Sequence, residues 1–143
     1  VNRGWLLEKQ GDTQGAISAY RSAISANASN SKARINLGLL LIKQGQLNEA
    51  QALLEKAVEL DDTNAMGHVN LGYVYLQKER WVDAERACRK AVQINPKSVL
   101  GWSNLGLACI NQGNRGAARA AWEKAAALNP ADETVRRNLE RLR

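Results

Sequence analysis

Residues 65–98 read AMGHVNLGYVYLQKERWVDAERACRKAVQINPKS, and residues 99–132 read VLGWSNLGLACINQGNRGAARAAWEKAAALNPAD. Aligned without a gap, the two stretches share an Asn-Leu-Gly triplet, three alanines and an Asn-Pro pair. The same spacing of 34 residues runs through the rest of the chain and links Gly4, Gly38, Gly72 and Gly106, then Ala16, Ala50, Ala84 and Ala118, and then Asn2, Asn36, Asn70, Asn104 and Asn138. A fixed period of this length indicates stacked structural repeats.

Each period contains two amphipathic stretches, which residues 31–64 illustrate. Apolar residues recur at helical spacing in Ser31–Lys43 and again in Asn48–Glu59. Gly45 separates the two stretches and suits the left-handed position at the end of a helix. The pattern therefore predicts a pair of antiparallel helices in each repeat, with Gly38 and Ala50 where the two helix axes come close.

The composition agrees with a folded helical protein. Hydrophobic residues make up 45% of the 143 residues, and only 2 prolines occur. The longest apolar run, Leu39–Ile42, is far shorter than the roughly 20 residues that cross a bilayer, so no membrane segment is expected. We see no signal peptide, and no residue fixes the compartment; we expect a soluble protein and favour the cytoplasm.

The repeats resemble the tetratricopeptide-repeat (TPR) family, whose signature is Trp-x2-Leu-Gly-x2-Tyr, then Ala-x3-Phe, then Pro. The last repeat matches this signature with Trp102, Leu105, Gly106, Ala118 and Pro130, and has Cys109 and Trp122 at the two aromatic positions. The resemblance covers the whole chain. It implies an all-α fold, a right-handed superhelical solenoid of antiparallel helix hairpins that ends in a C-terminal capping helix.

The period divides residues 1–132 into four repeats, followed by a last helix. We expect the repeats at residues 1–30, 31–64, 65–98 and 99–132. Residues 133–143 resume the first-helix pattern but have Glu140 in place of the glycine, so we expect a capping helix with a polar outer face. Val1 corresponds to a point inside a first helix, which predicts that one or more residues, or whole repeats, precede it.

The family resemblance implies that first helices line a concave groove that binds other proteins. An Asn side chain carries a donor and an acceptor, so the Asn ladder suits the backbone of an extended peptide; local contacts within the helices are the alternative role. Around the ladder we expect apolar pockets that include Val69, Leu76, Ile42 and Ile110. The candidate peptide-binding residues are Asn2, Trp5, Asn36, Leu39, Lys43, Asn70, Tyr73, Gln77, Asn104, Leu107 and Asn111.

Residues suited to catalysis or metal binding are scarce. The chain has 1 His and 2 Cys, without metal-ligand spacing, a nucleophile motif or a phosphate-binding loop. Cys88 and Cys109 fall at core positions of the repeat, where we expect them to be buried as small hydrophobic residues. We therefore expect no enzyme activity, no catalytic residue, no cofactor and no metal site.

The leading interpretation is a protein–protein interaction scaffold that binds a peptide segment or helix of a partner in the concave groove. A second interpretation is a homo-oligomer that stacks through its end helices, because we expect the first helix to be exposed and to present Trp5. Nucleic-acid binding is a weaker alternative. Residues 72–143 have 13 Lys and Arg against 7 Asp and Glu, but their helical spacing and the capping helix favour a solvated basic face, so nucleic acid is not the expected partner.

Overall fold

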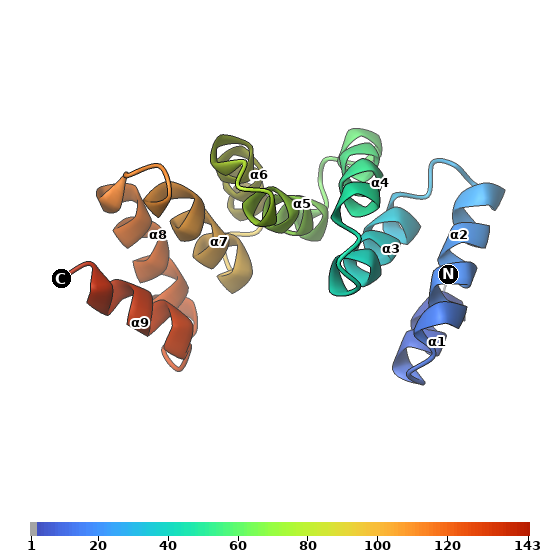
Figure 1. Cartoon of the computed structure of the whole chain (residues 1–143), viewed down its shortest axis with the longest axis horizontal. Helices are drawn as coiled ribbons and strands as arrows, with labels where there is room; N and C mark the ends of the chain where they lie inside the picture. The colour runs from blue at the N-terminus through green and yellow to red at the C-terminus, as the bar shows by residue number, and fades with distance from the viewer. Residues whose placement is uncertain (1–2) are drawn as a thin grey trace. The chain divides into compact units, whose positions relative to one another are not determined.

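The computed structural model describes residues 3–143, which form nine α-helices and no strand (Figure 1). Asn2, one of the candidate residues, lies outside this range. Helix follows helix through short turns, as the hairpin pattern predicts. The helices are α1 (Arg3–Lys9), α2 (Thr13–Ala26), α3 (Ser31–Lys43), α4 (Leu47–Leu60), α5 (Ala65–Gln77), α6 (Trp81–Ile94), α7 (Val99–Ile110), α8 (Arg115–Leu128) and α9 (Glu133–Arg141).

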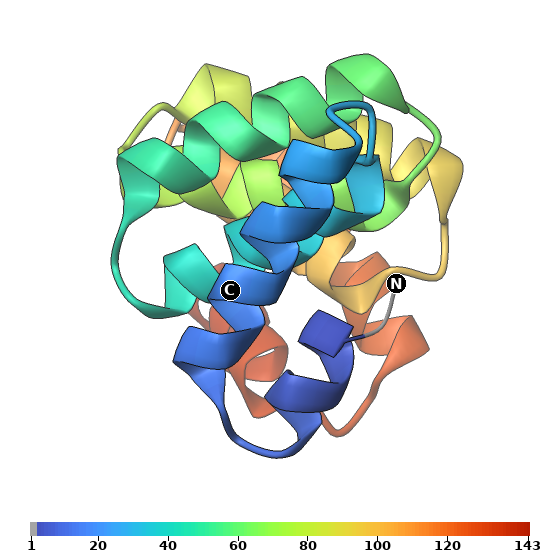
Figure 2. The same cartoon turned by 90° about the vertical axis from the view of Figure 1, so that its right-hand side faces the viewer.

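The chain divides into two compact units, unit 1 (Val1–Thr63) and unit 2 (Asn64–Arg143). In unit 1, α1 pairs with α2, α3 pairs with α4, and α2 packs against α3. In unit 2, α5 pairs with α6 and α7 pairs with α8, while α7 packs against both α5 and α6. The hairpin of α1 and α2, drawn in blue, faces the viewer in Figure 2. Helix α9 packs against α8. We call α1, α3, α5 and α7 the first helices and their partners the second helices.

The glycine ladder lies where each first helix meets its second helix. A Cβ on Gly38 would come within 2.8 Å of Leu54 Cγ, and one on Gly72 within 2.6 Å of Cys88 Sγ. In the same way, Gly4 faces the ring of Tyr20, and Gly106 faces the ring of Trp122. The predicted close approach of the two helices is therefore confirmed, since a side chain at these positions would overlap the opposite helix.

The turns that end the first helices repeat as well. Gly11, Gly45 and Gly113 adopt left-handed backbone with φ near +80°, and Glu79 holds the same position of the period with φ +59°. A left-handed residue lets the chain reverse and satisfies the last carbonyls of the helix. Its backbone N–H reaches back to the first helix, as Gly45 does to the Ile42 carbonyl at 3.0 Å.

The two cysteines lie in the core of unit 2, as predicted. They belong to a buried cluster with Val92, Leu105 and Trp122 from α6, α7 and α8. Burial and the neighbouring Cys109 raise the pKa of the Cys88 thiol to about 12, and burial also raises the pKa of Cys109. Both thiols therefore stay protonated at neutral pH and act as apolar packing groups.

Helix α9 is fixed to α8 by hydrogen bonds at its end. The guanidinium groups of Arg115 and Arg119 both donate to the Leu142 carbonyl, each at 3.0 Å. Val135 and Leu142 are buried in the unit 2 cluster, while Arg136, Arg137 and Arg141 are exposed. Helix α9 thus has an apolar side against α8 and a basic side in solvent. None of the described helices is long and apolar enough to cross a membrane.

Candidate functional site

The first helices of unit 2 present a group of exposed apolar side chains. Met66 and Tyr73 on α5 are 44% and 40% exposed, and Leu100 on α7 is 59% exposed. Leu107, further along α7, is half-buried. Each helix contributes two residues seven apart, which is two helical turns, and the two helices pack against each other. These four residues are the apolar patch of unit 2.

The asparagines of the ladder differ in their surroundings. Asn36 on α3 is half-buried, and its side chain hydrogen-bonds to the Tyr20 hydroxyl. Asn70 and Asn104 in unit 2 are only 6% and 8% exposed. The amide nitrogen of Asn70 is shielded from solvent and has no hydrogen-bond partner among the described residues. Asn36 therefore makes an internal contact, whereas Asn70 holds an unused donor.

The other candidate residues lie in several places. Trp5 is exposed on α1, with Lys9 Nζ 5.4 Å from the centre of its ring. Asn111 donates to the carbonyl of Leu107 in its own helix at 2.8 Å. The remaining three are half-buried or exposed residues of α3 and α5, namely Leu39, Lys43 and Gln77.

The expectation of apolar pockets around the Asn ladder is wrong in part. Val69 and Leu76 on α5 are buried, so they do not offer open pockets. Ile42 and Ile110 are half-buried. The physical reason is that a first helix packs on more than one neighbour, so the side it leaves open is narrower than its apolar pattern suggests. On the first helices of unit 2, the large exposed apolar side chains are Met66, Tyr73 and Leu100, while Val82 and Leu128 are exposed on the second helices α6 and α8.

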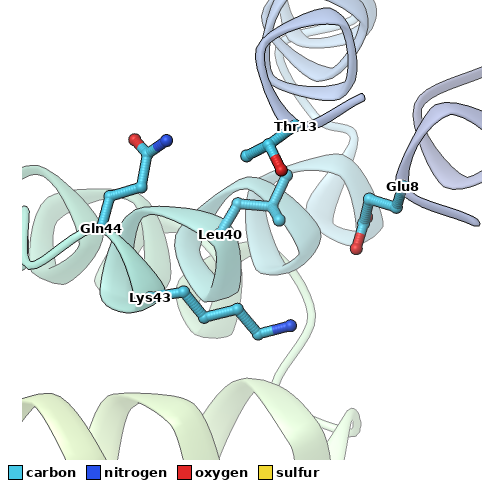
Figure 3. A pocket seen from close by; sticks show the side chains of 5 residues that line it. All are labelled: Glu8, Thr13, Leu40, Lys43 and Gln44. Carbon is cyan, nitrogen blue, oxygen red and sulfur yellow. The ribbon is translucent and has the colours of Figure 1, made fainter. Parts of the chain in front are cut away.

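A pocket that sequence reasoning missed lies in unit 1 (Figure 3). It has a volume of about 370 Å³, and Glu8 of α1, Thr13 of α2, and Leu40, Lys43 and Gln44 at the end of α3 line it. Glu8 Oε1 accepts a hydrogen bond from the Tyr20 hydroxyl. Burial, and then this bond to Glu8, raises the pKa of Tyr20, which keeps the hydroxyl protonated as the donor. We call this space the α1–α3 pocket.

A second pocket of unit 1 lies between α1 and α2. It has a volume of about 490 Å³, and its wall on α2 consists of small residues. Near it, Trp5 and Leu6 of α1 are about half exposed. We call it the α1–α2 pocket, and its lining residues are Arg3, Leu7, Asp12, Gly15, Ser18, Ala19, Ser22 and Ala23.

Many of the basic side chains of unit 2 have structural contacts. Arg80 and Arg86 pair with Asp83, and Arg89 pairs with Glu85 at 2.7 Å. Arg89 and Gln112 lower the pKa of the Glu85 carboxyl. Lys124 Nζ lies 5.8 Å from the centre of the Trp102 ring, and Arg115 and Arg119 fix α9. These contacts give those basic side chains structural roles within unit 2.

Residues that could hold a metal ion are not grouped. Within residues 3–143, no cluster of three or more His, Cys, Asp or Glu side chains has a geometry suited to a metal. The single histidine, His68, is buried on α5, and both cysteines belong to the apolar cluster.

Comparison with known families agrees with the hairpin geometry. Three tetratricopeptide-repeat models match consecutive parts of the chain, at residues 7–69, 65–98 and 99–132. The chain belongs to the tetratricopeptide-repeat family. This membership confirms the predicted all-α solenoid of helix hairpins. A search of curated proteins by sequence found no match.

Solved structures of TPR proteins have the same fold. A crystal structure of MamA superposes with a TM-score of 0.90 at 26% identity, over 99% of this chain and 83% of that one. The TPR domain of Arabidopsis OM64 gives 0.77 at 27% identity, over 79% and 93% of the two chains. The first TPR of Spaghetti (RPAP3), bound to an HSP90 peptide, gives 0.76 over 78% and 89%, and at 22% identity it shows the fold alone. The TPR fold is a typical non-enzymatic scaffold for protein interactions.

Proposed function

We propose that this TPR protein binds a peptide segment or a helix of a partner protein on its first helices, in the concave groove that the family forms. The observation that carries the proposal is the apolar patch of unit 2 beside Asn70 and Asn104 on the same two helices. The patch supplies apolar contact, and the asparagines supply hydrogen bonds. The two contributions have separate physical causes.

The apolar half rests on the exposure of large side chains. Single exposed hydrophobic residues are common on soluble proteins, but a group on two adjoining helices is typical of an interaction surface. Tyr73 brings an aromatic ring with a polar tip, a type of residue enriched among those that dominate binding energy. The spacing of seven residues on each helix allows a partner helix, or alternate side chains of a strand, to lie across the patch.

The polar half rests on the amide of Asn70. A buried donor without a partner costs roughly 1–3 kcal/mol relative to one that is hydrogen-bonded. A backbone carbonyl of a ligand would give the Asn70 nitrogen that partner, after a small movement of the side chains that cover it. Asn104 holds the same position of the period on α7 and would act one repeat further along.

The division into repeats belongs to the same proposal. We propose repeats at residues 1–30, 31–64, 65–98 and 99–132, with 133–143 as a capping helix. The register supports α9 as a continuation of the first-helix pattern, because Asn138 and Leu139 hold the places of Asn104 and Leu105. Its exposed arginines give it the polar outer side that the end of a solenoid requires.

Selection from a library of random displayed peptides tests the proposal. The full chain should enrich a motif with apolar residues, and the double variant Asn70→Ala, Asn104→Ala should lose at least tenfold in affinity for it. Asn111→Ala is the matched control, because its amide bonds within α7, and it should keep its affinity. A motif bound equally well by the double variant, or no motif at all, would contradict binding through the ladder.

Self-assembly is a second candidate, and the observation that favours it is the exposed pair Trp5 and Leu6 near the α1–α2 pocket. Small residues on α2 allow a helix of another copy to approach closely. Sedimentation of the parent and of a Trp5→Glu, Leu6→Glu variant tests this. A dimer or higher species at micromolar concentration should become monomeric in the variant, whereas a parent that stays monomeric at high concentration contradicts it.

A further inference from the structure

The two units place different side chains at the same positions of the 34-residue period, and the α1–α3 pocket shows the consequence. Two periods after Thr13 stands Trp81, and two periods after Glu8 stands Leu76. Leu76 is buried and Trp81 is half-buried. Unit 2 thus has two large apolar side chains where unit 1 has a small hydroxyl and a carboxylate around a pocket of about 370 Å³.

The glutamines that follow α7 in unit 2 and α3 in unit 1 also differ in their contacts. In unit 2, Gln112 Nε2 donates to Glu85 Oε1 at 2.8 Å and to the Ala108 carbonyl at 3.0 Å, and it lies 3.4 Å from the Trp81 carbonyl. Gln44, at the matching position of unit 1, lines the pocket instead. In unit 2 the glutamine at this position is hydrogen-bonded to neighbouring residues, whereas in unit 1 it lines a pocket.

We propose that the α1–α3 pocket binds an aromatic side chain with a polar tip, tyrosine or tryptophan, from a partner protein. The chain itself provides the analogy, because the residue that matches Thr13 in unit 2 is a tryptophan. Replacing an indole by the short side chain of threonine leaves room for a ring of similar size. Leu40 provides an apolar wall against which such a ring packs.

The charged groups around the pocket favour a ligand ring that carries a neutral polar group. Glu8 and Lys43 extend toward the same side of the opening (Figure 3). Glu8 Oε1 is held by Tyr20, which leaves Oε2 to accept a further bond. Lys43 makes no hydrogen bond or ion pair with another residue of the described range. A charged ligand side chain would meet one like charge here, whereas a neutral phenol can donate to Glu8 and accept from Lys43.

The pocket shares no lining residue with the Asn ladder of unit 2, so the two proposals can fail independently. It lies in unit 1, and none of its five lining residues is part of the apolar patch. A partner that binds the patch need not use the pocket. Small aromatic amides, which are too short to follow the ladder, therefore probe the pocket alone.

Titration followed by ¹H–¹⁵N NMR on the full chain tests the proposal. The probes are N-acetyltyrosinamide and N-acetyltryptophanamide, with the amides of N-acetylleucine and N-acetyllysine as controls. The aromatic probes should give saturable shifts centred on the amides of Thr13 and Gln44, with a Kd on the order of 1 mM. The two controls should bind at least fivefold more weakly. Shifts spread over the surface, or equal binding of the leucine amide, would overturn the assignment.

Three variants make the test specific. Thr13→Trp should fill the pocket with the side chain found in unit 2 and abolish the shifts, and Thr13→Leu, matching Leu47 of α4, should weaken binding if the larger change fails to fold. Lys43→Met should weaken the tyrosine probe several-fold but leave the tryptophan probe unchanged, because an indole only donates. Unchanged binding by both Thr13 variants, or equal loss of the two probes in Lys43→Met, would contradict this account of the pocket.

Discussion

Units 1 and 2 follow one 34-residue pattern, yet their first helices meet their neighbours differently. In unit 2, α5 packs against α7, and Gln112 at the end of α7 bonds to residues of α6. In unit 1, the matching region around α1 and α3 is the α1–α3 pocket, lined by charged and polar groups. The repeat therefore determines where helices lie, while a few side chains determine whether the space between them is filled.

The difference can be assigned to particular substitutions in the period. Thr13 in place of Trp81 removes volume, and Glu8 in place of Leu76 adds charge. Neither change disturbs the glycine and alanine ladders, since Ala16 and Ala84 are both fully buried. A pocket can thus form in a repeat protein while the small residues between its paired helices stay buried.

The largest expected effect comes from breaking the filled core of unit 2. Trp122→Ala should lower the free energy of unfolding by about 3–5 kcal/mol, because it empties a buried site and removes the Nε1 bond to the Ser103 carbonyl at 3.1 Å. Urea unfolding followed by circular dichroism measures the change. Trp5→Ala, an exposed tryptophan of unit 1, is the control and should change stability by less than about 0.5 kcal/mol. Equal losses would contradict the burial.

A second effect is a loss of stability at alkaline pH, which follows from the difference between the pKa values of the two thiols in the folded and unfolded protein. The folded pKa of Cys88 is about 12 and that of Cys109 is also raised, so unfolded thiols ionise first as the pH increases. The stabilisation is complete below about pH 8.5. Above it, the ionisation of Cys88 in the unfolded state removes roughly 1.4 kcal/mol per pH unit, and Cys109 contributes in the same direction.

Urea unfolding between pH 7 and 10 checks this effect. The double variant Cys88→Ala, Cys109→Ala is the control, because it removes both thiols from one core. Its stability should fall with pH much less steeply than that of the parent. Parallel curves for the two proteins would show that other groups govern the alkaline loss.

A third, smaller effect tests the left-handed residue at the end of a first helix in each unit. Glu79→Gly should stabilise the protein by about 0.5–1 kcal/mol, because a glycine adopts φ +59° without steric cost. Gly45→Ala, at the same position in unit 1, should destabilise it by about 1–2 kcal/mol. Thermal unfolding measures both changes. A loss of stability in Glu79→Gly would indicate that the glutamate side chain has a role of its own.

The smallest expected effect compares the two glutamines at the ends of α3 and α7. Gln112→Ala removes bonds to Glu85 and Ala108 and should cost about 0.5–1 kcal/mol. Gln44→Ala is the matched variant, since no bond of its side chain to a described residue is found, and it should be close to neutral. The difference between the two, measured by urea unfolding, should vanish if the two regions are equivalent.

Much of the fold could be predicted because the period repeats the same physical constraints. Ser31–Lys43 was expected as a helix and is observed with those bounds, and Gly45 has the left-handed backbone that its position requires. Each ladder glycine predicts a close helix contact, since no other residue leaves room for the opposite side chain. Cys88 and Cys109 were assigned to the core from register alone, and both are buried.

The surfaces were harder to predict, because a period gives the direction of a side chain but not what covers it. Val69 and Leu76 have the right positions for a groove, yet neighbouring elements bury them. The α1–α3 pocket depends on Glu8, Thr13 and Lys43 coming together from three helices. One feature of the sequence indicates this pocket, namely the small Thr13 at the position where residues 65–98 have Trp81.

The glycine ladder has a consequence for how such a sequence can change over generations. Opposite its four glycines stand a tyrosine, a leucine, a cysteine and a tryptophan, Tyr20, Leu54, Cys88 and Trp122. A glycine has no side chain that must fit a particular partner. The glycine can therefore stay the same in every repeat while the residue opposite it differs in size and shape. When such a hairpin is duplicated or exchanged between repeats, the close contact between its two helices is therefore retained.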